Sequence, residues 1–146
     1  MFSTSLIYFG MSCSYNDYMM KTLKVFVSED SVIVKDLLVS MFQALEGTYI
    51  AGTAADTVGI LNEVQRTQPD VVTLDICMPG GGNGIDVLQA LKKMKPAPKV
   101  IMLTNYSSDL YRKKCMALGA DFFLDKTTEF DKIPKIFKQL RKGDKT

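Results

Sequence analysis

The sequence predicts an α/β fold in which a five-stranded parallel sheet is doubly wound, with helices on both faces. From Leu23 onward, short apolar runs alternate with amphipathic segments, which indicates strands alternating with helices. Runs such as 71–74 and 100–103 are apolar almost throughout, which is typical of strands buried on both faces. Strands that alternate with helices favour parallel pairing and right-handed crossovers.

Five strands and five helices are expected in alternation. The strands cover residues 23–27, 48–53, 71–74, 100–103 and 122–124, with Gly52 interrupting the second. The helices follow at about 31–46, 56–68, 85–94, 108–119 and from about 131 onward. The first of them has Val34, Leu38, Met41 and Leu45 on one face.

Capping residues define the helix boundaries. The expected starts are at Ser31 or Asp30, at Asp56, and at Ser107 or Ser108. Gly47 is expected as the C′ glycine that ends the first helix. Pro134 is placed in the first turn of the last helix, where no backbone hydrogen bond is lost.

Size and composition exclude several classes of protein. The chain has 146 residues, 47% of them hydrophobic and 23% charged, which suits one globular domain. Its net charge of +2 argues against a nucleic-acid binder, and no apolar run is long enough for a membrane helix. The absence of histidine removes the commonest general base and zinc ligand. Three widely spaced cysteines, Cys13, Cys77 and Cys115, suggest free thiols in a reducing cytoplasm.

Two segments differ in composition. Residues 1–21 are expected to form a flexible N-terminal extension, the alternative being an arm that packs on the domain or on a second copy. Residues 22–146 are expected to form the domain, with no output domain after it.

Residues with reactive or metal-binding side chains follow the apolar runs. Glu29 and Asp30 come after the first run, Asp75 after the third, Thr104 after the fourth and Lys126 shortly after the fifth. Sites in open parallel sheets form at the carboxyl ends of the strands, so these groups are expected to converge.

Such a group of side chains suits phosphoryl transfer. Clustered carboxylates repel one another, and Mg²⁺ relieves that repulsion while leaving room for a phosphate oxygen. Asp75 can then attack phosphorus as a nucleophile. The Lys126 ammonium and the Thr104 hydroxyl can each contact a phosphoryl oxygen, and no histidine or cysteine base is needed.

Four fragments together resemble the receiver domain of two-component response regulators. They are Ser28-Glu29-Asp30-Ser31, Asp75-Ile76-Cys77-Met78-Pro79, Leu103-Thr104 and Asp125-Lys126. The resemblance covers about residues 23–140 and implies a flavodoxin-like sheet of order 2-1-3-4-5. It implies that a histidine kinase or a histidine phosphotransfer protein phosphorylates Asp75, and that Glu29, Asp30, Asp75 and the backbone carbonyl of Cys77 hold Mg²⁺.

The resemblance also implies a switch. Thr104 would close on the phosphoryl group, Lys126 would pair with it, and Phe123 would move inward. The changed surface would comprise the helix after Ser108, the strand at 122–124 and the last helix, where Thr104 and Phe123 are expected to reach outward. That surface would bind a downstream protein or a second copy of the chain. The chain would be a cytoplasmic phosphoprotein and no enzyme beyond its own phosphorylation and dephosphorylation.

Three positions depart from the family pattern. Glu29 replaces the more frequent aspartate, and Thr127 follows Lys126 where proline is usual, so a cis Lys126-Thr127 bond is left open. The loop after Asp75 contains Gly80, Gly81 and Gly82 and is expected to be longer by one residue and mobile.

Other functions and plainer roles remain open from the sequence. A Mg²⁺-dependent phosphatase or phosphotransferase with an aspartate nucleophile is the main alternative, although Ile76 and Cys77 offer no second acid and no cap insertion exists. A flavin-binding module would need a Ser/Thr/Gly-rich phosphate loop where Glu29 and Asp30 stand. Asp30 could simply cap a helix, and Phe123 could be an ordinary core residue.

Overall fold

The five expected strands form one parallel sheet. The computed structural model describes residues 20–80 and 83–143. Its strands are β1 (Leu23–Ser28), β2 (Thr48–Ala54), β3 (Val71–Leu74), β4 (Lys99–Thr104) and β5 (Phe122–Asp125). They lie in the order β2-β1-β3-β4-β5, and each neighbouring pair is parallel. The predicted fold class and strand order are therefore confirmed.

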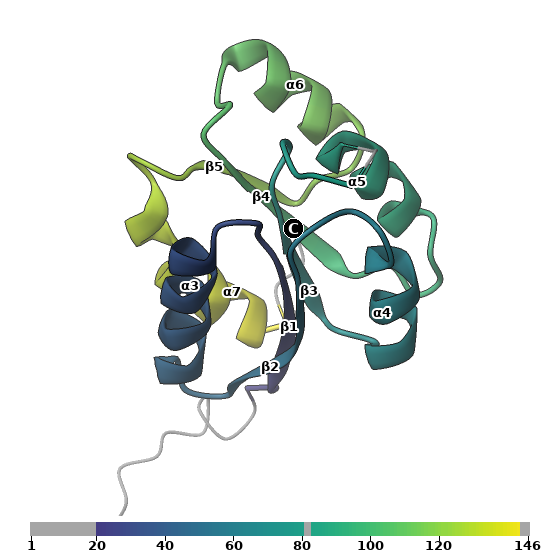
Figure 1. Ribbon diagram of the computed structural model, residues 1–146. Helices are drawn as coiled ribbons and strands as arrows, with labels where there is room; N and C mark the ends of the chain where they lie inside the picture. The colour runs from purple at the N-terminus through teal and green to yellow at the C-terminus, as the bar shows by residue number, and fades with distance from the viewer. Residues whose placement is uncertain (1–19, 81–82, 144–146) are drawn as a thin grey trace, which may run out of the picture.

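Helices cover both faces of the sheet (Figure 1). Along the chain they are α3 (Val32–Ala44), α4 (Ile60–Thr67), α5 (Gly84–Lys92), α6 (Asp109–Ala117), the short 3-10 helix η1 (Phe130–Lys132) and α7 (Ile133–Arg141). In Figure 1, α3 and α7 lie on one side of the strands, whereas α4, α5 and α6 lie on the other. Among the described residues, no helix combines the length and apolar character needed to cross a membrane.

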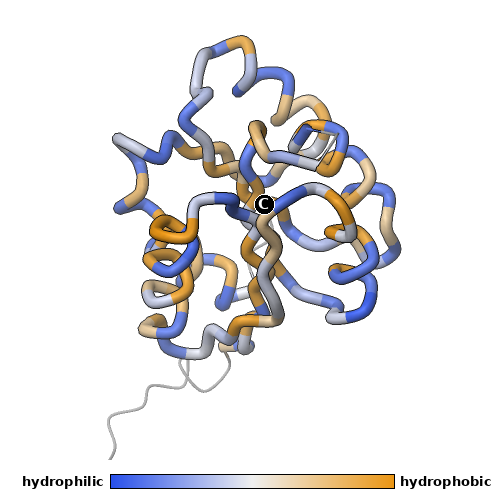
Figure 2. Tube along the Cα trace, viewed as in Figure 1, coloured by the Kyte–Doolittle hydropathy of each residue, from blue (hydrophilic) through white to orange (hydrophobic). Residues whose placement is uncertain are grey.

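Two apolar layers hold these helices to the sheet. One layer joins side chains of α4, α5 and α6 to residues such as Phe26, Val72 and Met102. The other joins α3 and α7 to residues such as Val25 and Ile101. Successive strand residues face opposite sides, so each strand contributes to both layers. The tube in Figure 2 is accordingly hydrophobic along much of the central strands.

Two of the expected helix starts are confirmed by hydrogen bonds. The Ser31 side chain accepts from the backbone N–H of Val34 at 3.3 Å and caps α3. Ser108 caps α6 by accepting from Tyr111 N at 3.4 Å. Pro134 lies in the first turn of α7, as expected. These caps fix where each helix leaves the carboxyl edge of the sheet.

Two boundary predictions were wrong. Asp56 does not cap a helix, because its carboxylate accepts from Val58 N at 3.0 Å in a local turn and α4 starts only at Ile60, after Gly59. Gly47 is not the C′ residue of α3: the helix already ends at Ala44, and Leu45 is the extended C-cap. Gly47 instead has a φ of +73° and is the last residue before β2.

The segment 1–21 is described only at its end. The expectation of a flexible extension falls on residues 1–19, which lie outside the described residues. Lys21 is held against the end of α7: its N–H donates to Arg141 O at 3.1 Å, and Arg141 Nε donates to Lys21 O at 3.0 Å.

Candidate phosphoryl-acceptor site

Three carboxylates gather at the carboxyl edge of the sheet. The candidate ligand oxygens of Glu29, Asp30 and Asp75 all lie within 4.8 Å of one another. Strand register explains why. β1 and β3 are paired with Ser28 opposite Leu74, so the chain continues from these two positions directly to Glu29 and Asp75. The predicted convergence of the acids is thus present.

Lys126 joins this cluster from the other side. Its ammonium lies 2.6 Å from Asp75 Oδ2 and 2.6 Å from Glu29 Oε1. The three side chains are 10%, 8% and 2% exposed respectively, so the contacts are shielded from water. Burial lowers the pKa of Lys126, but the hydrogen bonds and charges of the two carboxylates outweigh it, and the pKa of the lysine is raised. The ion pair with Glu29 was not anticipated from the sequence.

The remaining oxygens of the cluster differ in their environment. Glu29 Oε2 accepts from Ser31 N at 3.1 Å, and Asp75 Oδ1 accepts from Cys77 N at 3.2 Å. Asp30 is exposed and, among residues 20–80 and 83–143, makes no hydrogen bond or ion pair through its carboxylate. Three carboxylates against one ammonium leave two negative charges in excess, which a single divalent cation balances. The donor set is therefore one that fits Mg²⁺.

The cluster opens into a hollow of about 690 Å³. Its walls include the three acids, Lys126 and Cys77, as the sequence suggested. Four further residues were missed, because they lie on loops and helices with no motif of their own: Leu37, Asn105, Tyr106 and Phe130. Their mixture of apolar and polar groups gives the acids a partly apolar rim.

Thr104 and Phe123 lie in the interior, contrary to the expectation that they reach outward. Thr104 is 0% exposed and Phe123 is 4% exposed. Thr104 is the last residue of β4, and its Oγ1 accepts from Tyr106 N at 3.0 Å, which turns the hydroxyl toward its own loop. A side chain held this way does not line the hollow beside Asp75.

Phe123 is held inward by an arginine. The Arg112 guanidinium lies 4.8 Å from the centroid of the Phe123 ring, and its Nη1 donates to Phe123 O at 2.8 Å. Nη2 donates to Glu129 Oε1 at 3.0 Å. The ring packs in the layer formed with α4, α5 and α6, so the plainer role of a core aromatic describes its position here.

Gly84 lets helix α5 approach Asp75 closely. A Cβ at Gly84 would overlap the Asp75 carbonyl oxygen, and Gly84 N donates to Ile76 O at 2.7 Å. Asn83 caps α5 by accepting from the N–H groups of Ile85 and Asp86. From the sequence, the glycines of this loop were expected only to make it mobile. Gly81 and Gly82, on which that expectation partly rests, lie outside the described residues.

The peptide bond after Lys126 is trans. Lys95-Pro96 is the only cis bond recorded within residues 20–80 and 83–143. Thr127 N donates to Asp125 Oδ1 at 2.6 Å, a bond that a proline at this position lacks.

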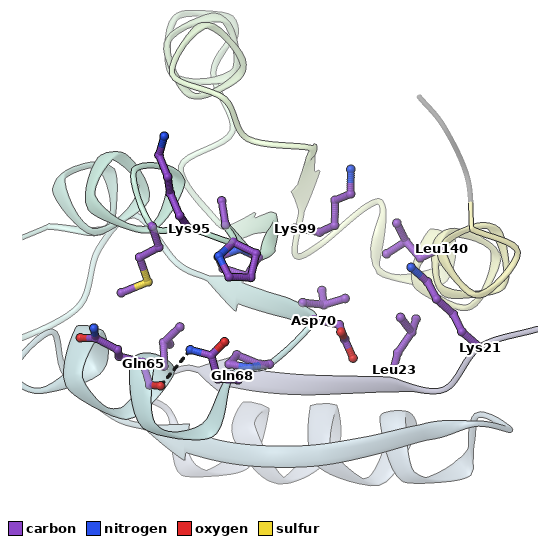
Figure 3. Close-up of a pocket in the computed structure, with 15 residues that line it drawn as sticks. Lys21, Leu23, Gln65, Gln68, Asp70, Lys95, Lys99 and Leu140 are labelled. Atoms are coloured by element: carbon purple, nitrogen blue, oxygen red, sulfur yellow. Dashed lines mark hydrogen bonds between the residues drawn. The ribbon is translucent and has the colours of Figure 1, made fainter.

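A second hollow, of about 410 Å³, lies at the opposite edge of the sheet. Figure 3 shows Lys21, Lys95 and Lys99 around it together with Asp70, Leu23 and Leu140. Its residues flank the amino ends of β1, β3 and β4. Asp70 is the acidic residue among those that line this hollow, and one of its carboxylate oxygens accepts a hydrogen bond from Lys24 N at 2.8 Å. The hollow therefore has no acid cluster comparable to that at Asp75.

Comparison with known proteins identifies the family. Residues 25–138 match the response regulator receiver domain. The chain is 34% identical over 125 residues to a protein-glutamate methylesterase/protein-glutamine glutaminase of Clostridium acetobutylicum, covering 84% of this chain and 36% of that protein. It is 27% identical over 121 residues to the transcriptional regulatory protein LnrK of Bacillus subtilis, covering 83% of this chain and 54% of that protein. The chain thus spans about a third to a half of the length of these relatives.

Solved structures share the fold. The response regulator domain of Thermotoga maritima CheB superposes with a TM-score of 0.73 at 22% identity, covering 86% of this chain and all of that one. The isolated REC domain of RcsB from Salmonella enterica serovar Typhimurium, in the presence of phosphomimetic BeF3-, gives 0.79 at 23% identity, covering 86% and 93%. These structures show the fold alone, whereas the sequence match over residues 25–138 shows that the chain belongs to the family of response regulator receiver domains.

Proposed function

We propose that this chain accepts a phosphoryl group on Asp75 and thereby switches a protein-interaction surface. The observation that carries the proposal is the contact of Asp75 with Lys126 at 2.6 Å inside a cluster of three carboxylates at the strand ends. Family membership supports it independently. The donor is a histidine kinase or a histidine phosphotransfer protein, and the setting is the cytoplasm.

The residues divide the chemistry among them. An Asp75 oxygen attacks phosphorus, so an O–P bond forms while the P–N bond of the donor's phosphohistidine breaks and its electron pair stays on the imidazole. Mg²⁺, held by Glu29, Asp30, Asp75 and the Cys77 carbonyl, would neutralise charge on the acids and on a phosphoryl oxygen. The Lys126 ammonium, already beside the acceptor carboxylate, stabilises charge on another oxygen. Thr104 would have to exchange its bond with Tyr106 N to reach the third.

The output we propose is the surface of α6, β5 and α7. Phosphorylation adds about −1.5 to −2 charge and favours whichever pre-existing conformation places donors around it. Movement of Thr104 would change the space available to the Phe123 ring. The exposed apolar side chains of α6, Leu110 at 75% and Met116 at 44%, suit contact with a downstream protein or a second copy. No catalysis beyond self-phosphorylation and self-dephosphorylation is proposed.

The phosphodonor protein is proposed to approach over the start of α3. Ile33 is 81% exposed and Leu37 is 54% exposed, and Leu37 also lines the hollow that contains Asp75. An apolar patch beside a charged site is typical of a protein-interaction surface. Ile33→Asp should therefore slow transfer from the partner's phosphohistidine while leaving reaction with a small phosphodonor unchanged.

Intact-mass measurement tests the function directly. Incubation with Mg²⁺ and acetyl phosphate should add one phosphoryl group that is stable to acid and labile to base. Asp75→Ala should take none, whereas Asp131→Ala, which changes an exposed aspartate outside the cluster, should react like the natural chain. Rapid turnover of many phosphoesters would instead support the phosphatase alternative, and a bound yellow chromophore would support a flavin module.

A further inference from the structure

The turn after β5 holds Lys126 in place through one carboxylate. Asp125 Oδ1 accepts from Thr127 N at 2.6 Å and from Thr128 N at 3.1 Å. The turn is closed a second time by Glu129, whose N–H donates to Asp125 O at 2.9 Å and whose Oε1 accepts from Asp125 N at 3.0 Å. The Asp125 side chain therefore fixes the backbone of Thr127 and Thr128, and Glu129 fixes the backbone of Asp125 itself.

The same carboxylate reaches the loop after β4. Ser107 Oγ donates to Asp125 Oδ2. Ser107 lies three residues after Thr104, and Thr104 O in turn accepts from Lys126 N at 3.0 Å. Two separate bonds thus link the segment that carries Lys126 to the segment that carries Thr104, and one of them is accepted by the Asp125 carboxylate.

The carboxylate is charged under ordinary conditions. The bond from Ser107, followed by the backbone bonds from the turn, lowers the pKa of Asp125 to about 2. A charged acceptor makes stronger hydrogen bonds than a neutral one, so the turn is stiffened at neutral pH.

We propose that Asp125 is a positioning residue for Lys126: it holds the turn that directs the lysine ammonium at Asp75. A lysine side chain has many rotamers and reaches a buried carboxylate reproducibly only when its backbone is held still. The short contacts of the ammonium with Asp75 and Glu29 show the geometry that this turn maintains. The proposal deepens the proposed function and rests on it, since Lys126 is taken to stabilise the transferring phosphoryl group.

A displaced lysine should slow phosphorylation measurably. Misplacement by about 1 Å of a group that acts on the transition state can cost on the order of 100-fold in rate. Asp125→Ala removes three accepted bonds but leaves Glu129 in the turn, so a fall of roughly 10-fold is expected. Asp125→Asn retains an oxygen for the Thr127 and Thr128 N–H groups and turns an amide toward Ser107, so its loss should be smaller.

The experiment measures the rate of phosphorylation at saturating Mg²⁺ and acetyl phosphate by intact mass. Asp125→Ala, Asp125→Asn and Ser107→Ala are compared with the natural chain, and Asp131→Ala is the matched control. Asp125→Ala is also combined with Lys126→Met. A residue that acts through Lys126 should have no further effect once the ammonium is gone, whereas damage to the fold would lower both rates alike.

A second readout does not depend on phosphorylation. Lys126 is 10% exposed, so an amine-acylating reagent followed by peptide mass mapping should label it slowly in the natural chain and faster in Asp125→Ala. If Asp125→Ala does not fold, Ser107→Ala and Asp125→Asn carry both measurements.

The outcomes separate this inference from the proposed function. The positioning role is overturned if folded Asp125→Ala is phosphorylated as fast as the natural chain. It is also overturned if the substitution lowers the phosphorylation rate equally with and without Lys126. Either result leaves the proposed function standing. If the natural chain takes no phosphoryl group, the proposed function fails. The positioning role is then decided by lysine labelling. If Lys126 is as well protected in Asp125→Ala as in the natural chain, the positioning role is overturned.

Discussion

Replacing Asp30 by asparagine should stabilise the protein in the absence of metal. Asp30 is exposed, pairs with no cation in the described part of the chain and lies within 4.8 Å of two other carboxylates. At that separation each like-charge pair costs about 0.9 kcal/mol in a water-like dielectric. Attraction to the nearby Lys126 offsets part of this repulsion, so a net gain of about 1 kcal/mol is expected on its removal.

The same substitution should remove the response to Mg²⁺. A cation that binds only the folded protein stabilises it by about 1.4 kcal/mol when present at ten times its dissociation constant. Asp30 is the acid of the cluster whose oxygens are not already used by other protein groups, so its loss should weaken cation binding most directly. The metal-free and metal-bound effects of one substitution therefore have opposite signs.

Thermal unfolding followed by circular dichroism, in EDTA and in a Mg²⁺ series, measures both effects. For a chain of this size 1 kcal/mol corresponds to about 3 °C in Tm. Asp30→Asn should melt about 3 °C above the natural chain in EDTA and should not shift with Mg²⁺, whereas the control Asp131→Asn should behave like the natural chain in both. A variant that melts below the natural chain in EDTA, or that gains as much from Mg²⁺, would refute the electrostatic argument.

Three further substitutions test other parts of the structure. Lys126→Met leaves two buried carboxylates without their cation and should cost about 3 kcal/mol or more in urea unfolding, an effect that added Mg²⁺ should reduce. Gly84→Ala brings a methyl group against the Asp75 carbonyl and should cost about 1–3 kcal/mol while slowing phosphorylation; unchanged values would show that α5 can shift freely. Glu129 has a folded pKa of about 2 against an ordinary 4.5, chiefly because Lys132 bonds to it, so its stabilisation is full above pH 4.5 and is lost toward pH 2. The fall of Tm over that interval should be shallower in Glu129→Gln, and an unchanged slope would contradict this assignment.

Local patterns were sufficient to predict the sheet and the positions of the acids. Strands 71–74 and 100–103 were evident because buried parallel strands are apolar almost throughout. The carboxyl ends of parallel strands share one edge of the sheet. Glu29 and Asp75, which follow two of these strands, were therefore expected to lie together. The structure adds that the register of β1 against β3 makes the two acids direct neighbours.

Neither the choice between competing local hydrogen bonds nor contacts between distant segments could be predicted in this way. The cap assigned to Asp56 failed because a carboxylate can serve a turn two residues on as readily as a helix start. The inward Phe123 ring lies against Arg112, which no spacing rule connects to it. The Lys126–Glu29 pair likewise depends on the distance from β5 to β1, across the two intervening strands β4 and β3.

Lys126 connects the acid cluster to the proposed output surface, and this connection explains how a local charge could have a distant effect. Its ammonium lies between Asp75 and Glu29, while the preceding residue, Asp125, accepts a hydrogen bond from Ser107, just before the N-cap of α6. A phosphoryl group on Asp75 would offer the ammonium a stronger acceptor farther from the strand end. Because Asp125 resists movement of the turn, the lysine side chain would adjust before its backbone does. The remaining strain would then fall on the Ser107 bond, and therefore on α6, rather than on the sheet.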